Sequence, residues 1–555
     1  MKDPYPILNF IKIYERSFIE NWNLPALTDY SSQSTISYGG LAQKIAMIHL
    51  FFENIGIRPG DKVALCGRDS VEWVKIYMAV VTYGAVIVPI LSDFNPVDVS
   101  HIVNHSGARL LFVSPQVWEH MQPEQLLKAE GVFAIDTPRL LMERGNDISR
   151  HLRLLRRRFR RRYPEGYTSH DIRYPDIPNS ALAEINYTSG TTGFSKGVML
   201  TGGNLAGNVC FGIESGLHFR SSRALAFLPL AHAYGCAFDM LTPLAVGSHI
   251  TLLGKTPSPR VLMKAMAEVR PNLVICVPLV LEKIYNNQIL PMISKGAMRW
   301  TLAVPLLDSL VYSKIRKRLI DAFGGEFEEV IVGGAPLNRE VEEFLHKIKF
   351  PFTVGYGMTE CGPLISYTPW REFRPGSSGR TLPSMESMVM SEDPENIPGE
   401  ICVRGSNVMQ GYYRNPEATE MVLSDNGWLK TGDVGTRSAD GTIYIRGRSK
   451  TMLLSSSGQN IYPEEIEAKL NNMPFVAESL VVMRDGKLVA LVYPDFEQAD
   501  RLGLTAADLP GEMEKACADL NRLVAPYERV SRIILMPTEF EKTPKRSIKR
   551  FLYSN

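Results

Sequence analysis

The segment from residue 187 to residue 200 has the composition of a loop that binds polyphosphate. It reads Tyr-Thr-Ser-Gly-Thr-Thr-Gly-Phe-Ser-Lys-Gly-Val-Met-Leu and directly follows an apolar run at 181–185. Glycine lets the backbone approach phosphate oxygens, and hydroxyl and ammonium groups supply donors and positive charge. The residues that fit this use are Thr188, Ser189, Gly190, Thr191, Thr192, Gly193 and Lys196. The spacing is not that of the Walker loop. For this segment alone, a flexible surface loop is the alternative.

Four further motifs follow in a fixed order. They are Val-Gly-Gly-Ala-Pro-Leu at 332–337, Gly-Tyr-Gly-Met-Thr-Glu at 355–360, Gly-Trp-Leu-Lys-Thr-Gly-Asp at 427–433 and Gly-Arg-Ser-Lys at 447–450. With the phosphate-type loop, their order and spacing resemble the adenylate-forming superfamily of acyl-CoA and aryl-CoA ligases. Two more segments, at 228–235 and 277–285, are most similar to long-chain fatty acid ligases within that superfamily.

The resemblance implies a reaction in two steps that uses ATP, Mg²⁺ and CoA. A carboxylate attacks the α-phosphate of ATP to give an acyl-adenylate and pyrophosphate, and a thiol then displaces AMP. By resemblance, Lys196 clamps the β- and γ-phosphates, Thr359 contacts the α-phosphate, and Asp433 and Arg448 hold the ribose. The other implied nucleotide contacts are Gly333, Gly334, Ala335, Pro336, Tyr356, Gly357 and Met358, with Tyr356 stacked on adenine.

The metal and acyl sites are also assigned through the resemblance. Glu360 matches the magnesium ligand, with Thr188 as a second ligand, and Mg²⁺ commonly takes only one or two carboxylates beside phosphate oxygens. The expected acyl-binding residues are His232, Tyr234, Gly235, Val332 and Gly334. A histidine satisfied within the core is the alternative for His232. We expect the small residues Gly212 and Gly235 to leave room for a long chain. Gly458 and Gln459 match the region near the pantetheine thiol.

The chain departs from the family pattern near its C-terminus. Relatives place a lysine there that bridges the substrate carboxylate and the α-phosphate, and the matching position in this chain is Ser547. A short neutral side chain cannot neutralise charge as an ammonium does. Lys545 and Lys549 share the face of Ser547 on an extended segment, because each lies two residues away. We rank Lys549 first because Arg550 follows it.

The elements that must position these residues are short β-branched runs, such as 86–90, alternating with helix-length segments, such as 338–348. This alternation predicts an α/β protein with helix-covered, largely parallel sheets, whose ligands bind at the carboxyl ends of the strands. From about residue 398, shorter strands and hairpin turns predict a small β-barrel-like subdomain. We expect an N-terminal adenylation domain at 1–447, a hinge at 448–450 containing Lys450, and a mobile α+β C-terminal domain at 451–555.

Composition narrows the partners and the location. The net charge of the 555 residues is only +2, which gives no reason to expect nucleic acid. The seven cysteines show neither close pairs nor metal-type spacing. The N-terminus lacks the pattern of a signal peptide, and the longest apolar stretch, at 76–91, is interrupted by Tyr83-Gly84 and Pro89. We expect no transmembrane helix and a cytoplasmic protein, with peripheral attachment at the inner face of the membrane as an addition.

One segment is not explained by the resemblance. Residues 150–162 contain eight arginines, and Ile148, Leu152, Leu155 and Phe159 recur at helical spacing. This pattern predicts a basic amphipathic helix. The three alternatives are a solvated insertion helix or partly disordered linker, a contact with anionic lipid through residues 148–163, and binding of an acidic partner or nucleic acid.

Three functions are consistent with these observations. The first is a ligase that makes acyl-CoA from a medium- or long-chain fatty acid. The second transfers the acyl group to an acyl carrier protein instead of CoA. The third is a non-catalytic acyl or nucleotide binder, which Ser547 suggests and the intact ATP motifs oppose. A homodimer is compatible with each of the three functions.

Overall fold

A computed structural model describes residues 7–137, 139–145, 147–188, 196–254, 258–293, 307–454, 460–484, 486–543 and 547–553. Its largest sheet has eight strands in the order β20-β9-β8-β4-β3-β5-β6-β7. The strands are β3 (Lys62–Cys66), β4 (Val86–Ile90), β5 (Leu110–Val113), β6 (Gly131–Ala134), β7 (Leu140–Glu143), β8 (Leu182–Thr188), β9 (Lys196–Thr201) and β20 (Gly411–Tyr412). The pairs from β8 through β6 are parallel, and β7, β9 and β20 add antiparallel edges.

A second sheet has seven strands in the order β14-β13-β12-β10-β11-β1-β2, with only the β1–β2 pair antiparallel. They are β1 (Pro25–Asp29), β2 (Thr35–Ser37), β10 (Arg223–Ala226), β11 (His249–Leu252), β12 (Leu273–Cys276), β13 (Glu329–Val332) and β14 (Phe352–Val354). Buried strands of Val, Ile and Leu fit parallel sheets covered on both faces. The predicted α/β class is therefore confirmed.

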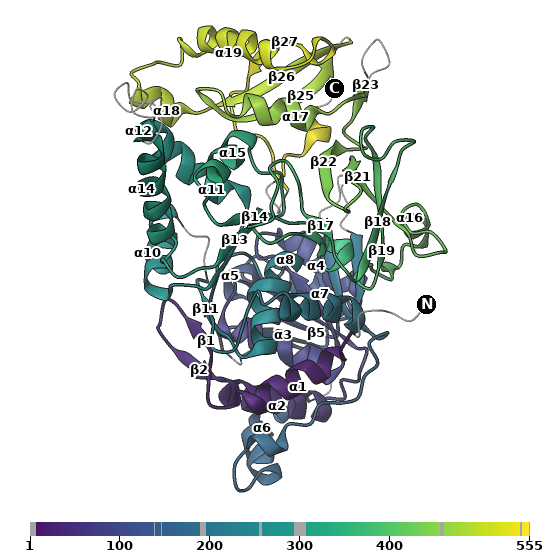
Figure 1. The fold of residues 1–555 in the computed structure, drawn as a ribbon. Helices are drawn as coiled ribbons and strands as arrows, with labels where there is room; N and C mark the ends of the chain where they lie inside the picture. Colours follow the sequence, from purple (N-terminus) through teal and green to yellow (C-terminus); the bar gives the residue numbers. More distant parts are fainter. Residues whose placement is uncertain are drawn as a thin grey trace.

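Helices cover both sheets (Figure 1). The main ones are α1 (Phe10–Glu20), α2 (Tyr38–Asn54), α3 (Val71–Tyr83), α4 (Pro96–Ser106), α7 (Gly202–Glu214), α10 (Pro259–Val269), α14 (Leu307–Ala322) and α15 (Arg339–Lys347). Helix α3 packs on β3 and β4 of one sheet and reaches β1 of the other. Its ends are set by sequence, since the Ser70 hydroxyl accepts from the Trp73 N–H and Gly84 supplies a left-handed residue with φ of 82°.

The β-rich region after residue 355 consists of two antiparallel sheets. One contains β15 (Tyr356–Gly357), β16 (Leu364–Tyr367) and β17 (Arg380–Thr381), and the other contains β18 (Met385–Met390), β19 (Gly399–Gly405), β21 (Leu429–Arg437) and β22 (Ile443–Arg448). An isolated bridge between Arg380 and Thr442 joins them. Antiparallel strands are thus present as the hairpin turns predict, but they begin at Tyr356, earlier than the predicted start at about residue 398, and form two sheets.

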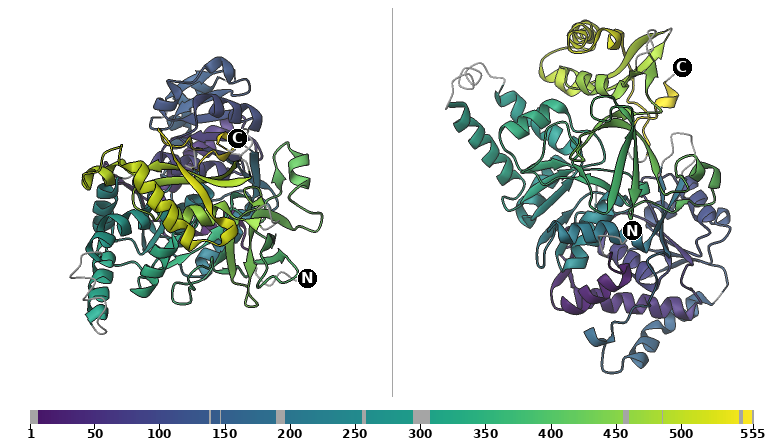
Figure 2. Two further views of the ribbon diagram at one scale, coloured as in Figure 1. Left: turned by 90° about the horizontal axis from the view of Figure 1, so that it is seen from above. Right: turned by 45° about the vertical axis from the view of Figure 1, so that its right-hand side comes forward.

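The C-terminal part forms a separate α+β layer at one end of the molecule (Figures 1 and 2). Strands β25 (Val476–Arg484), β26 (Lys487–Pro494) and β27 (Val530–Leu535) form its sheet, against which α17 (Pro463–Leu470) and α19 (Leu509–Leu523) pack. The core of the large part runs from Phe10 to Ile443, whereas the next core begins with Ile461. The predicted hinge, residues 448–450, lies between these two cores.

No helix among the described residues is long and apolar enough to cross a membrane.

Candidate functional site

The phosphate-type segment is the connection between two paired strands. Thr188 ends β8 and lies opposite Lys196, the first residue of β9. The Thr188 hydroxyl donates to the Lys196 carbonyl at 3.5 Å. The pairing fixes both ends of the segment at the edge where the parallel strands β4 and β8 terminate, as the sequence predicts. Ser189, Gly190, Thr191, Thr192 and Gly193 lie outside the described residues.

Tyr412 connects Lys196 with Glu360. The Lys196 Nζ lies over the Tyr412 ring, 4.7 Å from its centroid, and the Tyr412 hydroxyl donates to Glu360 Oε1 at 2.8 Å. Tyr412 lies on β20 and pairs with Val198 on β9, which brings it beside the phosphate-type segment. Burial, and secondly the charge of Glu360, raise the pKa of Tyr412, so the phenol stays protonated and donates. Sequence analysis did not single out this residue.

The two predicted ribose contacts meet across a second pair of strands. Asp433 on β21 lies opposite Arg448 on β22, and Arg448 Nε is 3.1 Å from Asp433 Oδ1. The Asp433 side chain is 8% exposed and that of Arg448 is 68% exposed. Burial raises the pKa of Asp433, and the charge of Arg448 opposes that shift. The carboxylate is therefore held inside the site while the guanidinium extends toward solvent.

Tyr356 supports the same carboxylate. Its hydroxyl donates to Asp433 Oδ2 at 2.7 Å, and the residue is buried. The sequence indicates both residues but not this contact between them. The stacking of adenine on the Tyr356 ring stays a prediction.

The turn after Tyr356 depends on a glycine. A Cβ at Gly357 would lie 2.3 Å from the Pro363 carbonyl oxygen, and the Met358 N–H donates to that same carbonyl at 2.9 Å. Thr359 and Glu360 then begin a short 3₁₀ helix, and both are partly exposed. The tight turn thus presents two polar side chains in sequence at the end of β15.

Gly333 and Gly334, predicted to contact the nucleotide, directly follow β13. Gly334 has a φ of 86°, which favours glycine, and Gly334, Ala335 and Pro336 are exposed. A Cβ at Gly333 would lie 3.0 Å from Tyr234 Cζ, and the Tyr234 hydroxyl donates to the Ile331 carbonyl at 3.0 Å. The predicted nucleotide wall and the predicted acyl segment are therefore in contact.

Two glycines expected near the acyl group are closely packed by the protein. A Cβ at Gly235 would lie 2.8 Å from the Pro229 carbonyl oxygen, and one at Gly212 would lie 2.7 Å from Thr242 Cγ2. The expectation that these glycines leave room for a long chain stays a prediction. His232 is partly exposed and immediately precedes helix α8 (Ala233–Gly235), while Val332 is fully buried.

The C-terminal segment holds its cations in ion pairs. Lys549 Nζ lies 3.4 Å from Glu541 Oε2, and Arg550 pairs with Glu464 at 3.6 Å and with Glu467. The Ser547 N–H donates to Thr543 Oγ1 at 3.3 Å, and antiparallel pairing brings 541–543 and 547–549 together. Lys545, Gly458 and Gln459 lie outside the described residues, and Lys450 is exposed.

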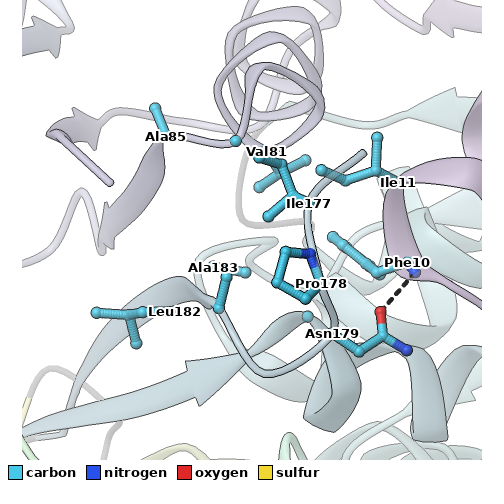
Figure 3. A pocket seen from close by; sticks show the side chains of 12 residues that line it. Phe10, Ile11, Val81, Ala85, Ile177, Pro178, Asn179, Leu182 and Ala183 are labelled. Carbon is cyan, nitrogen blue, oxygen red and sulfur yellow. Dashed lines mark hydrogen bonds between the residues drawn. The ribbon is translucent and has the colours of Figure 1, made fainter. Parts of the chain in front are cut away.

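A shallow apolar pocket lies elsewhere, between the start of α1, the end of α3 and residues 177–183 (Figure 3). Its main polar group, the Asn179 side-chain oxygen, accepts from the Phe10 N–H at 2.9 Å. The cavity volume is about 20 Å³, close to that of one water molecule. None of the residues predicted for chemistry lines this pocket.

Comparison with known proteins identifies the family of the chain. A family model described as "AMP-binding enzyme" matches residues 15–413, which include the phosphate-type segment, Glu360 and Tyr412. The chain belongs to the AMP-binding enzyme family. A relative in this family, long-chain-fatty-acid–CoA ligase FadD15 of Mycobacterium tuberculosis, is 28% identical over 92% of this chain and 88% of its own length. Feruloyl-CoA synthase of an Amycolatopsis species is 31% identical over 81% and 80%, respectively.

The fold of this family member also matches a solved structure. The anthranilate-CoA ligase AuaEII in complex with anthranoyl-AMP superposes with a TM-score of 0.77 at 20% identity, covering 100% of this chain and 98% of that one. This likeness shows that the AMP-binding fold extends through the C-terminal α+β layer, beyond the residues that the family model matches.

Proposed function

We propose that the protein is an ATP-dependent ligase that converts a medium- or long-chain fatty acid to its CoA thioester through an acyl-adenylate, releasing AMP and pyrophosphate. Family membership supports the adenylating chemistry, and the name of the FadD15 relative supports the acyl class. The observation that carries the proposal is the contact of Lys196 and Glu360 with one side chain, Tyr412. That contact gathers a cation and a carboxylate from distant motifs at one site.

The residues of the first step divide by the part of ATP that they hold. Lys196 and the hydroxyls of the 188–196 segment bind the β- and γ-phosphates, and Thr359 binds the α-phosphate. Asp433 accepts hydrogen bonds from the ribose hydroxyls, steadied by Tyr356 and Arg448. Adenine lies between Tyr356 and residues 333–336. Because charge accumulates on phosphate oxygens in the transition state, positioned donors and cations lower the barrier.

The oxygen groups of the site fit a magnesium ion. Glu360 is partly exposed and keeps one carboxylate oxygen on Tyr412, and the family ligand set needs only a carboxylate and a hydroxyl beside phosphate oxygens. Glu360 and Thr188 would hold the ion, which would neutralise charge on the phosphates when bound. Tyr412 orients the Glu360 carboxylate for that task.

The second step uses the C-terminal part of the chain. We place the domain boundary at residues 448–450, with Lys450 as the hinge residue, because the two hydrophobic cores separate between Ile443 and Ile461. Rotation there would bring Gly458 and Gln459 toward the thiol. For the first step, Lys549 or Lys545 supplies the ammonium that Ser547 lacks. His232, Tyr234, Gly235, Val332 and Gly334 border the acyl group.

Mass-spectrometric detection of products tests the proposal. Purified protein is incubated with ATP, Mg²⁺ and either a series of straight-chain fatty acids or ferulate, with and without CoA. We expect acyl-CoA only when CoA is present, with a preference for medium or long chains. Acyl-adenylate without acyl-CoA would indicate a carrier-protein acceptor. Preference for ferulate would overturn the acyl class, and neither product would overturn the ligase itself.

A further inference from the structure

Helix α6 is a strongly charged feature that the proposed function does not use. It spans Ile148–Arg162 and contains eight arginines and no acidic residue. The whole chain has a net charge of only +2, so the remaining residues together carry a net charge of −6. The excess of positive over negative charge therefore lies on this one helix.

The apolar side of α6 is already covered by the protein. Ile148 is fully buried, Phe159 is 7% exposed, and Leu152 and Leu155 pack against the core of the large part. Their helical spacing is thus explained by packing, and these side chains are not available to insert into a bilayer. Any contact with a membrane has to be made by charge.

Polar contacts fasten the same side to α2. Arg162 forms an ion pair with Glu53 at 2.6 Å, and Arg158 donates to Asn54 Oδ1 at 2.5 Å. These contacts hold the helix on a folded surface. Binding through its outward face therefore does not require the backbone of the helix to become ordered.

The outward face is a continuous stripe of arginine. Arg153, Arg156, Arg157, Arg160 and Arg161 follow the spacing of one helical face, and all five are exposed. The structure records no acidic partner for any of these five among the described residues. We call this set the arginine stripe. Unpaired guanidinium groups in a row are suited to phosphate groups, which they bind in a bidentate manner.

The position of the arginine stripe favours an extended surface, rather than a small carrier protein, as its binding partner. Helix α6 lies beyond α2 at the end of the molecule opposite the C-terminal layer, and both side views agree (Figures 1 and 2). A surface at that end leaves the C-terminal layer free to move. A carrier protein bound there would face away from the layer that has to receive its thiol.

We propose that the arginine stripe docks the protein on the head groups of an anionic phospholipid bilayer. The charge complementarity is direct, since basic residues near such a surface are attracted individually and the attraction adds up. The choice of a bilayer over other polyanions rests on the proposed function, because medium- and long-chain fatty acids partition into membranes. The stripe would hold the enzyme where its substrate is concentrated.

Vesicle sedimentation with the full chain tests the proposal. The probes are phosphatidylcholine vesicles with and without phosphatidylglycerol, at low and at raised salt, in the absence of ATP. We expect binding only to the anionic vesicles, weakened by salt. Replacing all five stripe residues by Gln should reduce the affinity about a hundredfold or more. Replacing them by Lys should preserve most of the binding.

A matched control removes five charges elsewhere. Arg260, Lys314, Lys317, Lys349 and Arg532 are exposed and lie outside α6, so their replacement by Gln should leave vesicle affinity within about threefold of wild type. Ligase activity on a water-soluble short-chain acid without vesicles should be equal in all variants, which separates failure of docking from failure of the proposed function. Absence of wild-type binding, equal binding by the Gln variant, or binding to an RNA duplex but not to vesicles would each overturn the proposal.

Discussion

The lysine of the phosphate-type segment and the lysine near the C-terminus lie in opposite electrostatic surroundings. Lys196 rests over the Tyr412 ring and has no carboxylate within ion-pair distance among the described residues. Lys549 is paired with Glu541 at 3.4 Å. A cation over an aromatic face gives up little when a phosphate arrives, whereas a cation in an ion pair has to exchange partners. On the proposed function, Lys196 can bind ATP without first breaking an ion pair, whereas Lys549 must leave Glu541 before it can act.

Removing the Lys196 cation should have the largest effect. We expect Lys196→Ala to lower the rate of ATP–pyrophosphate exchange about a thousandfold, because alanine removes the cation that neutralises charge on the phosphates in the proposed function. The measurement is isotope exchange between pyrophosphate and ATP that depends on added fatty acid, at saturating Mg²⁺. Lys314→Ala, at an exposed position on α14, is the control. Exchange within tenfold of wild type would remove Lys196 from the phosphate site.

Removing the paired cation separates the two half-reactions. We expect Lys549→Ala to slow adenylation about a hundredfold while the conversion of supplied acyl-adenylate to acyl-CoA stays within threefold. Single-turnover assays of each half-reaction measure this difference. Glu541→Gln releases Lys549 from its partner and should not slow adenylation. A large effect in Lys545→Ala with none in Lys549→Ala would reverse the ranking of the two lysines.

The buried carboxylate at the ribose position predicts a pH dependence. We expect Asp433→Asn to raise KM for ATP about thirtyfold, since an amide accepts with one oxygen and lacks charge. Burial raises the pKa of Asp433, so protonation should begin to weaken ATP binding at a higher pH than for an exposed aspartate. Arg448 opposes the shift, and Arg448→Gln should therefore move this acid limb to still higher pH.

Profiles of KM against pH for wild type, Asp433→Asn and Arg448→Gln measure these shifts. The Asn variant serves as the control because it cannot titrate at this position. An acid limb that is unchanged in the Asn variant would assign the titration to another group.

Tyr412 should give the smallest effect, because its replacement preserves both charged partners. Tyr412→Phe keeps the ring below Lys196 and removes only the donor to Glu360. We expect a three- to tenfold rise in the Mg²⁺ concentration for half-maximal activity. Tyr413→Phe is the matched control, because the neighbouring hydroxyl donates to the Ser106 carbonyl at 3.3 Å instead. Equal Mg²⁺ dependence in both variants would contradict the positioning role.

Local patterns predicted the framework well. The β-branched run at 86–90 coincides with β4, and the periodic segment at 338–348 contains α15, because each pattern directly records which side chains are buried. The motif residues Asp433 and Arg448 also meet in space, since a hairpin turn between their strands is readable from the sequence.

Features that depend on distant pairing were not predictable. Tyr412 reaches Lys196 only because β20 pairs with β9, strands more than 200 residues apart in the sequence. The sequence contains Gly212 and Gly235 but does not show that Thr242 and Pro229 lie against them. The helical spacing of apolar residues in α6 did not show that these residues pack on the core of the large part. In each case the missing information was the identity of the neighbour, which composition and spacing do not contain.

The separation of charge between α6 and the rest of the chain gives the protein a large electric dipole moment despite its small net charge. An electric field exerts a torque on such a molecule and orients it even where the net force on its small net charge is weak. On a negatively charged chromatography resin it should therefore adsorb in one orientation and be retained longer than its net charge alone would require. At a cell membrane the same torque would select the α6 end during approach, before any single arginine meets a phosphate.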